Sequence, residues 1–240
     1  MFPISDDNPR AIVPFVTWAI IAACIGVFIY QLMLPEQETL RFLYGFGMVP
    51  AELFGAGAPL IRAFNVPGPP EGATILTSMF LHGGLMHLAG NMLYLWIFGD
   101  NIEAAMGWFR FIIFYVVCGV AAALAQALSD PGSVIPMVGA SGAISGVLGA
   151  YLLLYPRATV RVLIFIIPFV QVIRVPAMVV LGLYFVMQVL FALFSVNGEG
   201  GGVAFWAHVG GFAAGMALIP FMKYSHVPLF QSRFRRGPWG

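Results

Sequence analysis

The 240-residue chain has few charged residues: Asp, Glu, Lys and Arg make up only 9% of it, while 60% is hydrophobic. A soluble globular domain carries about 25% charged residues. This shortage excludes a soluble domain and indicates that most of the surface faces a lipid bilayer. The formal net charge of +1 says little about partners, and we expect no nucleic acid among them.

The chain also has few of the residues that most metal and disulfide sites need, with two cysteines and four histidines. Its two cysteines, Cys24 and Cys118, lie inside apolar runs, which favours buried thiols over a disulfide or metal site. The histidines form no His-Glu-x-x-His motif, so we expect no metal and no other cofactor.

The first apolar run lacks a basic n-region and exceeds twenty residues, which predicts a retained helix rather than a cleaved signal peptide.

What the chain does have is long apolar segments, and a membrane-spanning helix needs about 20 apolar residues. Six segments are candidates: 11–33, 77–98, 108–128, 141–155, 175–194 and 203–222. They predict an all-α polytopic membrane protein, a six-transmembrane-helix bundle over 1–224 with a short fourth helix. A basic and mobile cytoplasmic tail is expected over 225–240.

The stretch 160–173 is apolar as well, but Pro168 interrupts it and Arg161 and Arg174 mark its ends. We interpret it as a re-entrant or interfacial hairpin. A seventh span is the alternative, and it would place the ends of all later segments on the opposite sides of the membrane.

The positive charges indicate how the helices are oriented. If the N-terminus is cytoplasmic, nine of the eleven Lys and Arg residues lie on the inner side, and only Arg41 and Arg62 on the outer side. Positive residues concentrate on the cytoplasmic side of membrane proteins. We therefore expect a multi-pass protein with both termini in the cytoplasm. The lack of an extra N-terminal helix or transit segment favours a bacterial inner membrane as its location.

Helix length places two polar residues at one depth. Ser141 begins the fourth segment and lies about 21 Å above its inner end, at a rise of about 1.5 Å per residue. His208 lies about 22 Å above Lys223 by the same count. Because the hydrocarbon core is about 30 Å thick, both side chains sit below the outer surface, and the fourth helix is too short to span.

More polar side chains fall in the second segment. His87 and Asn91 are spaced i, i+4 and share one helix face. Counted from a helix end at Asp100, Asn91 lies about 14 Å up, His87 about 20 Å and His82 about 27 Å. These residues are therefore expected close to the serine and histidine above.

Glycines predict which helices touch. Gly142 and Gly146 form one Gly-x-x-x-Gly pattern, and Gly211 and Gly215 form another. Small residues at this spacing let helix backbones approach closely. His208 shares the face of the second pair, so we expect the fourth and sixth helices to be in contact.

A serine and a histidine at one depth predict nucleophilic chemistry. A serine hydroxyl becomes a strong nucleophile when a base takes its proton, and neutral histidine is the usual base. After Glu103 the only acids are Asp130 and Glu199, both in expected loops. The sequence therefore predicts a Ser141–His208 dyad that opens to the outer side, rather than a triad with a carboxylate.

The same region offers hydrogen-bond donors for a developing negative charge. Ser141 begins a helix, whose first backbone N–H groups are unpaired and carry the positive end of the dipole. Asn91 and His87 add side-chain donors, and together they predict an oxyanion site. The plainer alternative is that His87 and Asn91 make structural hydrogen bonds between helices.

Three motifs resemble those of the rhomboid intramembrane serine proteases: Gly139-Ala140-Ser141-Gly142, Ala207-His208 with Gly211 and Gly215, and His87-Leu88-Ala89-Gly90-Asn91. The resemblance covers nearly all of the six-helix region and includes Glu103, Gly107, Phe111, Tyr115 and Gly119.

This resemblance implies that Ser141 is the nucleophile and His208 the base. It implies an oxyanion site made by Asn91, His87 and the Ser141 amide, with Gly139 and Gly142 as supporting residues. It also implies substrates that are membrane-spanning proteins, cleaved in or near their transmembrane helices.

One position departs from the family pattern. Some members carry a tyrosine four residues after the nucleophile, packed on the histidine, where this chain has Ser145. We expect an aromatic such as Trp206 or Phe212 to hold the imidazole instead. The loop over 34–76 also lacks the Trp-Arg pair associated with the family.

Other readings stay open. Gly-Ala-Ser-Gly alone is most often a packing motif. The resemblance implies that His82 supports water access or local structure, and the alternative is a solvated residue. A non-catalytic rhomboid-like protein that binds membrane helices is the main functional alternative. A transporter with broken helices is a third, weakened by the lack of buried charge and of repeats. The sequence does not indicate the oligomeric state.

Overall fold

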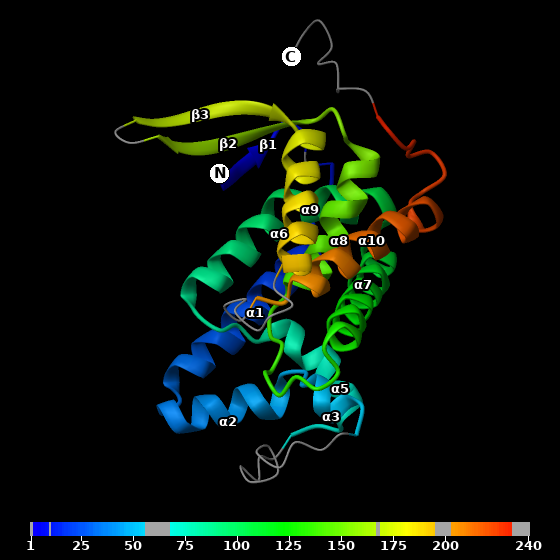
Figure 1. Cartoon of the computed structure of the whole chain (residues 1–240). Helices are drawn as coiled ribbons and strands as arrows, with labels where there is room; N and C mark the ends of the chain where they lie inside the picture. The colour runs from blue at the N-terminus through cyan, green and yellow to red at the C-terminus, as the bar shows by residue number, and fades with distance from the viewer. Residues whose placement is uncertain (1, 10, 56–67, 167–168, 195–202, 232–240) are drawn as a thin grey trace, which may run out of the picture.

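The computed structural model describes residues 2–9, 11–55, 68–166, 169–194 and 203–231. Within these ranges six long helices form a bundle (Figure 1). They are α1 (Phe15–Met33), α6 (Leu85–Met106), α7 (Trp108–Ser129), α8 (Ser141–Leu154), α9 (Ala177–Phe194) and α10 (Phe205–Met222). Each overlaps one of the predicted apolar segments.

Four of these helices, α1, α7, α9 and α10, are long and apolar enough to cross a membrane by length and composition. α8 has only 14 residues, about 21 Å at the α-helical rise, and is short as predicted. α6 has 22 residues but includes Asp100 and Glu103. That all six helices span the membrane therefore stays a prediction.

The predicted helix over 77–98 is wrong at both ends. A short helix, α5 (Glu71–Thr77), and a 3-10 turn, η1 (Ser78–Phe80), come first, and α6 begins only at Leu85. Gly83 and Gly84 separate them, and each glycine disfavours a helix by about 1 kcal/mol relative to alanine.

At its other end α6 continues past Asp100 to Met106 and stops at Gly107, whose φ of 82° suits glycine. Heights counted from Asp100 are therefore about 9 Å too small when measured from the true helix end. His82 lies before the helix rather than on it.

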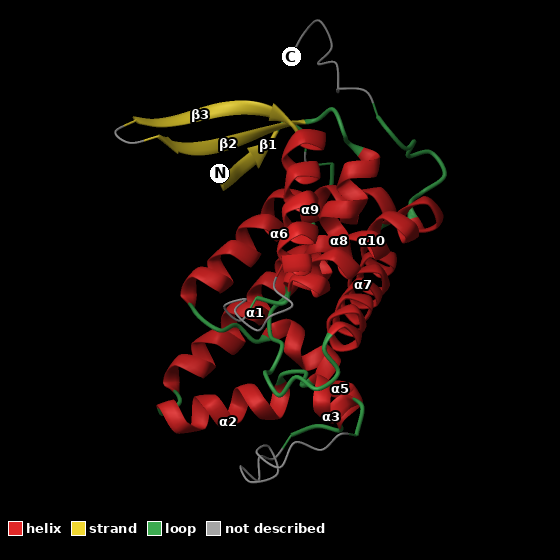
Figure 2. Cartoon of the chain, in the orientation of Figure 1, coloured by secondary structure: helices red, strands yellow, loops and turns green. Residues whose placement is uncertain are grey.

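A three-stranded antiparallel sheet projects sideways from one end of the bundle (Figures 1 and 2). Its strand order is β1 (Phe2–Asp6), β2 (Thr159–Ile166) and β3 (Phe169–Pro176). The expectation of an all-α protein is wrong here, because the fold is mostly helical with one small sheet. β2 and β3 are rich in Val and Ile, whose branched side chains favour strands.

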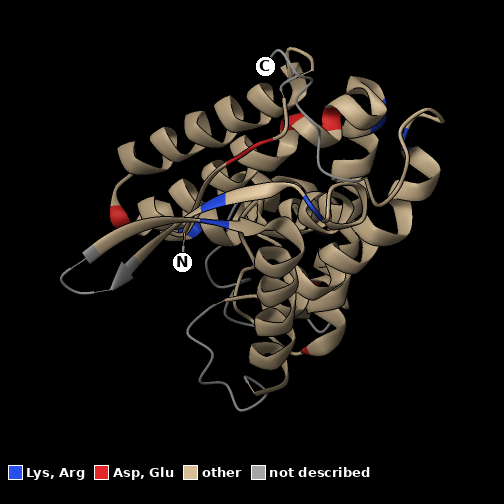
Figure 3. Cartoon of the chain, turned by 90° about the horizontal axis from the view of Figure 1, so that it is seen from above, with Lys and Arg blue, Asp and Glu red and all other residues tan. Residues whose placement is uncertain are grey.

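The stretch 160–173 is thus a hairpin, as predicted, but it is a β-hairpin, and the alternative of a seventh spanning helix is wrong. Pro168 lies outside the described residues. Arg161 and Arg174 are cross-strand neighbours. Figure 3 shows Lys and Arg residues on these strands, whereas most of the helical ribbon carries neither sign of charge.

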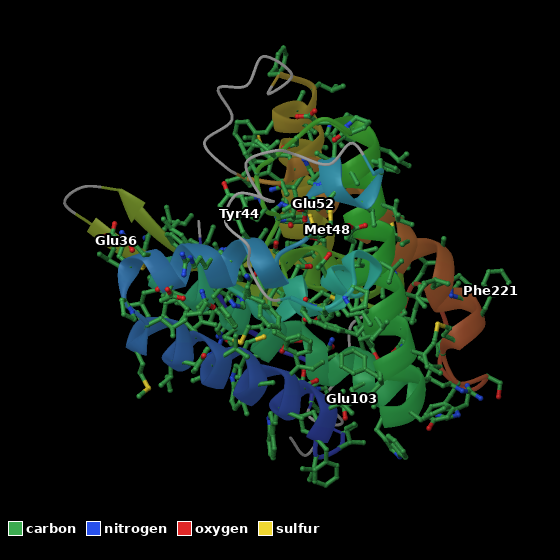
Figure 4. The ribbon with its side chains drawn as sticks, turned by 90° about the horizontal axis from the view of Figure 1, so that it is seen from below. Glu36, Tyr44, Met48, Glu52, Glu103 and Phe221 are labelled. Atoms are coloured by element: carbon green, nitrogen blue, oxygen red, sulfur yellow. The ribbon has the colours of Figure 1, made fainter. Side chains whose placement is uncertain are left out.

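The opposite end of the bundle is built by α2 (Glu36–Phe46), α3 (Pro50–Leu53) and α5 (Figure 1). Tyr44 of α2 packs against buried Val49 and Ala51, and Figure 4 views the molecule from this end. Met48 forms a two-way backbone bridge with Met137, with N···O distances of 3.1 and 2.8 Å. The connection between α2 and α3 is thereby fastened to the segment that leads into α8.

α8 lies at the centre of the fold, with 11 of its 14 residues buried. Its glycine face contacts α10, as the spacing predicts. A Cβ atom placed on Gly211 would collide with the carbonyl of Gly142, and one placed on Gly215 would collide with the carbonyl of Gly146. These two helices are therefore packed backbone against backbone.

Glu103 joins α6 to the start of α1. Its carboxylate accepts the backbone N–H groups of Val16 and Thr17 at 3.0 and 2.8 Å and the Thr17 hydroxyl at 2.8 Å. Figure 4 shows Glu103 beside the first turn of α1. A carboxylate at a helix N-terminus satisfies otherwise unpaired N–H groups and interacts favourably with the helix dipole.

The chain from Tyr224 to Gln231, which includes the first residues of the predicted tail, folds back onto the bundle. The backbone N–H of Tyr224 donates to Ala105 at 2.8 Å, that of Phe230 to Leu153 at 2.7 Å and that of Gln231 to Leu154 at 2.9 Å. Residues 232–240 lie outside the described part of the chain.

Candidate active site

Ser141 and His208 are in direct contact. Ser141 is the first residue of α8 and His208 lies in the first turn of α10, and the distance from Nε2 of His208 to Oγ of Ser141 is 2.8 Å. Both residues are half-buried. This separation lies within the about 2.6–3.2 Å over which a base takes a proton from a hydroxyl.

The backbone contact between α8 and α10 sets this distance. Gly211 is three residues after His208, and Gly142 directly follows Ser141, so the closest approach of the helices adjoins the dyad. Gln126 of α7 also accepts the backbone N–H of Ala207 at 3.3 Å, which fixes the start of α10. The geometry of the pair therefore depends on backbone packing rather than on mobile loops.

The segment before Ser141 is held in place by the backbone. The N–H of Gly139 donates to the carbonyl of Ser78 at 2.8 Å, and its φ of 122° is one that glycine adopts far more readily than other residues. A Cβ atom at Gly139 would lie 2.7 Å from the His87 imidazole. Glycine is therefore needed here both for its conformation and for space.

His87 and Asn91 face this same segment from α6. The Cβ position of Gly139 lies 2.7 Å from Nε2 of His87 and 3.6 Å from Nδ2 of Asn91, so both side chains reach the residues just before Ser141. Asn91 is buried, and its Nδ2 has no hydrogen-bond partner within the described ranges. A buried donor without an acceptor is costly, which makes this position suited to an incoming negatively charged oxygen.

His82 lies beside His87, with ring centroids 5.2 Å apart. Gln31 of α1 holds its backbone from both sides: Nε2 donates to the His82 carbonyl at 3.0 Å, and Oε1 accepts the His82 N–H at 3.2 Å. His82 is only 1% exposed. The alternative of a solvated His82 is therefore wrong, and the residue belongs to the packed surroundings of His87.

The second nitrogen of His208 is held by a residue that the sequence argument missed. Nδ1 of His208 lies 2.7 Å from Oε1 of Gln188 on α9, while the ring of Tyr184, one turn earlier, lies 6.4 Å from the imidazole. In the described structure neither Trp206 nor Phe212 stacks on His208, and Phe212 stacks on Phe185 instead at 4.6 Å. The expectation of Trp206 or Phe212 as the support is wrong.

Tyr184 also accounts for Ser145, the position where the pattern departs from the family. Oγ of Ser145 donates to the carbonyl of Ser141 at 2.8 Å and lies 2.8 Å from the Tyr184 hydroxyl. The aromatic ring near the imidazole thus comes from α9 rather than α8. One sequence feature pointed to it: Tyr184 and Gln188 are the only hydrogen-bonding side chains in α9, and polar groups in membrane helices are usually functional.

Both imidazole nitrogens of His208 are therefore occupied, one by a hydroxyl and one by an amide, and neither by a carboxylate. Over the residues that the structure describes, no three His, Cys, Asp or Glu residues are grouped closely enough to hold a metal ion. The arrangement supports proton transfer from a serine hydroxyl, with donors nearby for a developing oxyanion.

Comparison with known proteins gives the context for this geometry. A family model described as the Rhomboid domain matches residues 69–225. The Bacillus subtilis protein named Rhomboid protease GluP is 42% identical over 78 residues, which are 32% of this chain and 15% of that protein. The yeast Saccharomyces cerevisiae protein named Rhomboid protein 1, mitochondrial, is 35% identical over 99 residues, 40% of this chain and 29% of that protein.

A longer match is to RHOMBOID-like protein 2 of Arabidopsis thaliana, 30% identical over 147 residues, 53% of this chain and 46% of that protein. The chain thus spans less than half the length of each of these three relatives.

Proposed function

The chain belongs to the rhomboid family, and we propose that it is an intramembrane serine endopeptidase with Ser141 as nucleophile and His208 as general base. Membership and the four apolar helices identify an integral multi-pass membrane protein, in a family that includes serine proteases. The observation that carries the proposal is the 2.8 Å contact between Oγ of Ser141 and Nε2 of His208.

In the proposed reaction His208 accepts the Ser141 proton at Nε2 while Oγ forms a bond to the carbonyl carbon of the substrate. The tetrahedral intermediate breaks its C–N bond, and His208 donates the proton to the leaving amine. Water then attacks the acyl-enzyme with His208 again as base, which releases the acid product and restores the Ser141 hydroxyl.

The oxyanion of the intermediate is assigned to Asn91, His87 and the backbone N–H of Ser141. The unpartnered Nδ2 of Asn91 supports this role, as does the approach of His87 to the segment before Ser141. Removing one such donor typically costs about 3 kcal/mol of transition-state stabilisation. In this proposal His82, Gly139 and Gly142 support the site without touching substrate.

The proposed substrate class rests on the expected depth of Ser141 in the bilayer. It stands at the head of a helix of 14 residues, about 21 Å long, in a bilayer core of about 30 Å. A peptide bond that reaches it belongs to a membrane-spanning protein, cleaved in or near its transmembrane segment. The distribution of basic residues supports a six-span topology with cytoplasmic termini and an outward-opening site.

The test combines cleavage of a single-span substrate in liposomes with labelling by a fluorophosphonate probe. The native protein is expected to cleave and to be labelled at Ser141, whereas Ser141→Ala loses both, by more than about 10³-fold for cleavage. Ser225→Ala, at an exposed serine after α10, is the matched control and keeps full activity. A folded native protein that neither cleaves nor reacts refutes the proposal and favours a non-catalytic protein that binds membrane helices.

A further inference from the structure

We infer that Gln188 is a positioning residue that fixes the tautomer of His208, so that α9 supplies an uncharged third member of the catalytic group. This inference rests on the proposed function. Its basis is the chain of contacts from Oε1 of Gln188 to Nδ1 of His208 at 2.7 Å and from Nε2 of His208 to Oγ of Ser141 at 2.8 Å.

The contact with Gln188 determines which nitrogen of the His208 imidazole carries the proton. Neutral imidazole carries one proton, and the nitrogen that faces an acceptor holds it. The amide oxygen of Gln188 only accepts, so the proton stays on Nδ1. Nε2 then keeps a free lone pair toward Ser141, which is the form that can act as a base. The opposite tautomer would donate a proton to Ser141 and could not activate it.

An amide suits this location better than a carboxylate. A charged group within a membrane helix is expensive, and Gln188 is half-buried on α9. The amide dipole orients the ring without that cost, but it stabilises the imidazolium less than a carboxylate would. This explains how the chain orients His208 although no acid lies at its depth.

Tyr184 fixes the height of Gln188 relative to the dyad. The two residues are four apart on α9 and share one face. Because the Ser145 hydroxyl donates its proton to the Ser141 carbonyl, the Tyr184 hydroxyl is the donor in its 2.8 Å contact with Ser145. One face of α9 is thus linked to α8 through Tyr184 and to α10 through Gln188.

These links matter because α9 is loosely packed. Only 17% of the residues of α9 are buried, against 44% of an apolar 18-residue stretch of α7. Apolar contacts alone therefore hold α9 in register weakly, and its two polar side chains provide the directional contacts. We expect the position of the imidazole to depend on them.

The experiment compares Gln188→Leu, which removes the acceptor, with Gln188→Glu, which restores it and adds a charge. Gln188→Leu is expected to lower kcat about 10²-fold, the range of a misplaced general base, and to leave KM nearly unchanged. Gln188→Glu is expected to recover most of the rate and to move the acid limb of the pH–rate profile upward, because a neighbouring carboxylate favours the protonated imidazole. Met187→Leu, one residue away and 36% exposed, is the control.

A direct readout is the ¹⁵N NMR spectrum of the imidazoles, which is tractable with four histidines in the chain. His208 is expected as the Nδ1–H tautomer in the native protein and as a mixture in Gln188→Leu. A purely structural glutamine would change stability without changing tautomer or pH profile. Should Gln188→Leu fold poorly, Gln188→Met makes the same comparison with an unbranched side chain.

The outcomes separate the two proposals. If the native protein cleaves but Gln188→Leu matches it in kcat and tautomer, the role of Gln188 is refuted and the serine protease proposal stands. If Ser141→Ala cleaves like the native protein, the protease proposal fails first, and the inference about Gln188 falls with it.

Discussion

Replacing Gly211 by alanine tests whether backbone packing sets the geometry of the dyad. A Cβ atom there would lie 2.9 Å from the carbonyl carbon of Gly142 and closer still to its oxygen, whereas an ordinary contact begins near 3.4 Å. Both obstacles are backbone atoms of a buried helix, so no side-chain rotation relieves them. α8 and α10 must separate by at least about 0.5 Å, the difference between those two distances.

Ser141 and His208 sit on the two helices that would move apart. Their distance of 2.8 Å would lengthen to about 3.3 Å or more, beyond the about 3.2 Å limit for efficient proton transfer. A misplacement of 1 Å costs about 10²-fold in rate. We therefore expect kcat/KM of Gly211→Ala to fall about 10- to 100-fold, and the free energy of unfolding to drop by about 1–3 kcal/mol from overpacking.

The assay measures cleavage of a single-span substrate and the rate of fluorophosphonate labelling, together with thermal unfolding. Gly182→Ala in α9 is the matched control, because a Cβ atom there meets nothing within 4 Å. It should alter neither rate by more than about twofold, in keeping with substitutions on open surfaces. A Gly211→Ala protein that folds and is labelled as fast as the native one would show that the helix contact does not set the dyad distance.

Two further predictions concern the end of the bundle that carries the sheet. Burial raises the pKa of Asp6 from 3.8 to about 7, with the neighbouring carboxylates of Asp100 and Asp7 adding to the rise and the hydrogen bond from Tyr151 opposing it. Between these values the folded chain keeps a proton that the unfolded chain loses, so the free energy of unfolding should fall by about 1.4 kcal/mol per unit as pH rises through this window. Denaturant titrations at several pH values should show this slope for the native protein and its loss in Asp6→Asn; an unchanged slope would contradict it. Glu103→Gln weakens the acceptor for three donors at the start of α1 and is expected to lower unfolding free energy by about 1–3 kcal/mol. Glu38→Gln, at a half-exposed ion pair with Arg41, should cost under about 1 kcal/mol in the same measurement, and equal effects of the two would argue against the cap.

Segment length and glycine spacing were sufficient to predict much of the architecture. The long apolar runs predicted the positions of all six long helices, because a helix that crosses a bilayer needs about 20 apolar residues. The start of α8 at Ser141 followed from the glycine-rich break before it, and the contact of α8 with α10 followed from two Gly-x-x-x-Gly patterns. In each case the information is local or repeats along one helix.

The missed features depend on partners far apart in sequence. β2 becomes a strand partly because β1 pairs with it, as in Phe2↔Leu163, and such pairing leaves no periodic pattern in an apolar run. Gln188 was missed for a different reason. α9 is apolar on every side except at Tyr184 and Gln188, so its hydrophobic pattern does not specify which face meets the bundle. The two polar side chains mark that face, but only the three-dimensional packing shows that Gln188 meets His208.

The pairing of β1 with β2 also has a consequence for how the chain is made. Residues 2–6 leave the ribosome long before their partner strand, which begins at Thr159. β1 therefore has no partner strand until α1, α6, α7 and α8 have been synthesised and inserted. Closing so long a loop is slow relative to local helix formation. The sheet is accordingly one of the last elements to assemble. A fusion that delays or blocks β1 should leave the helices inserted but β2 without its pairing to β1.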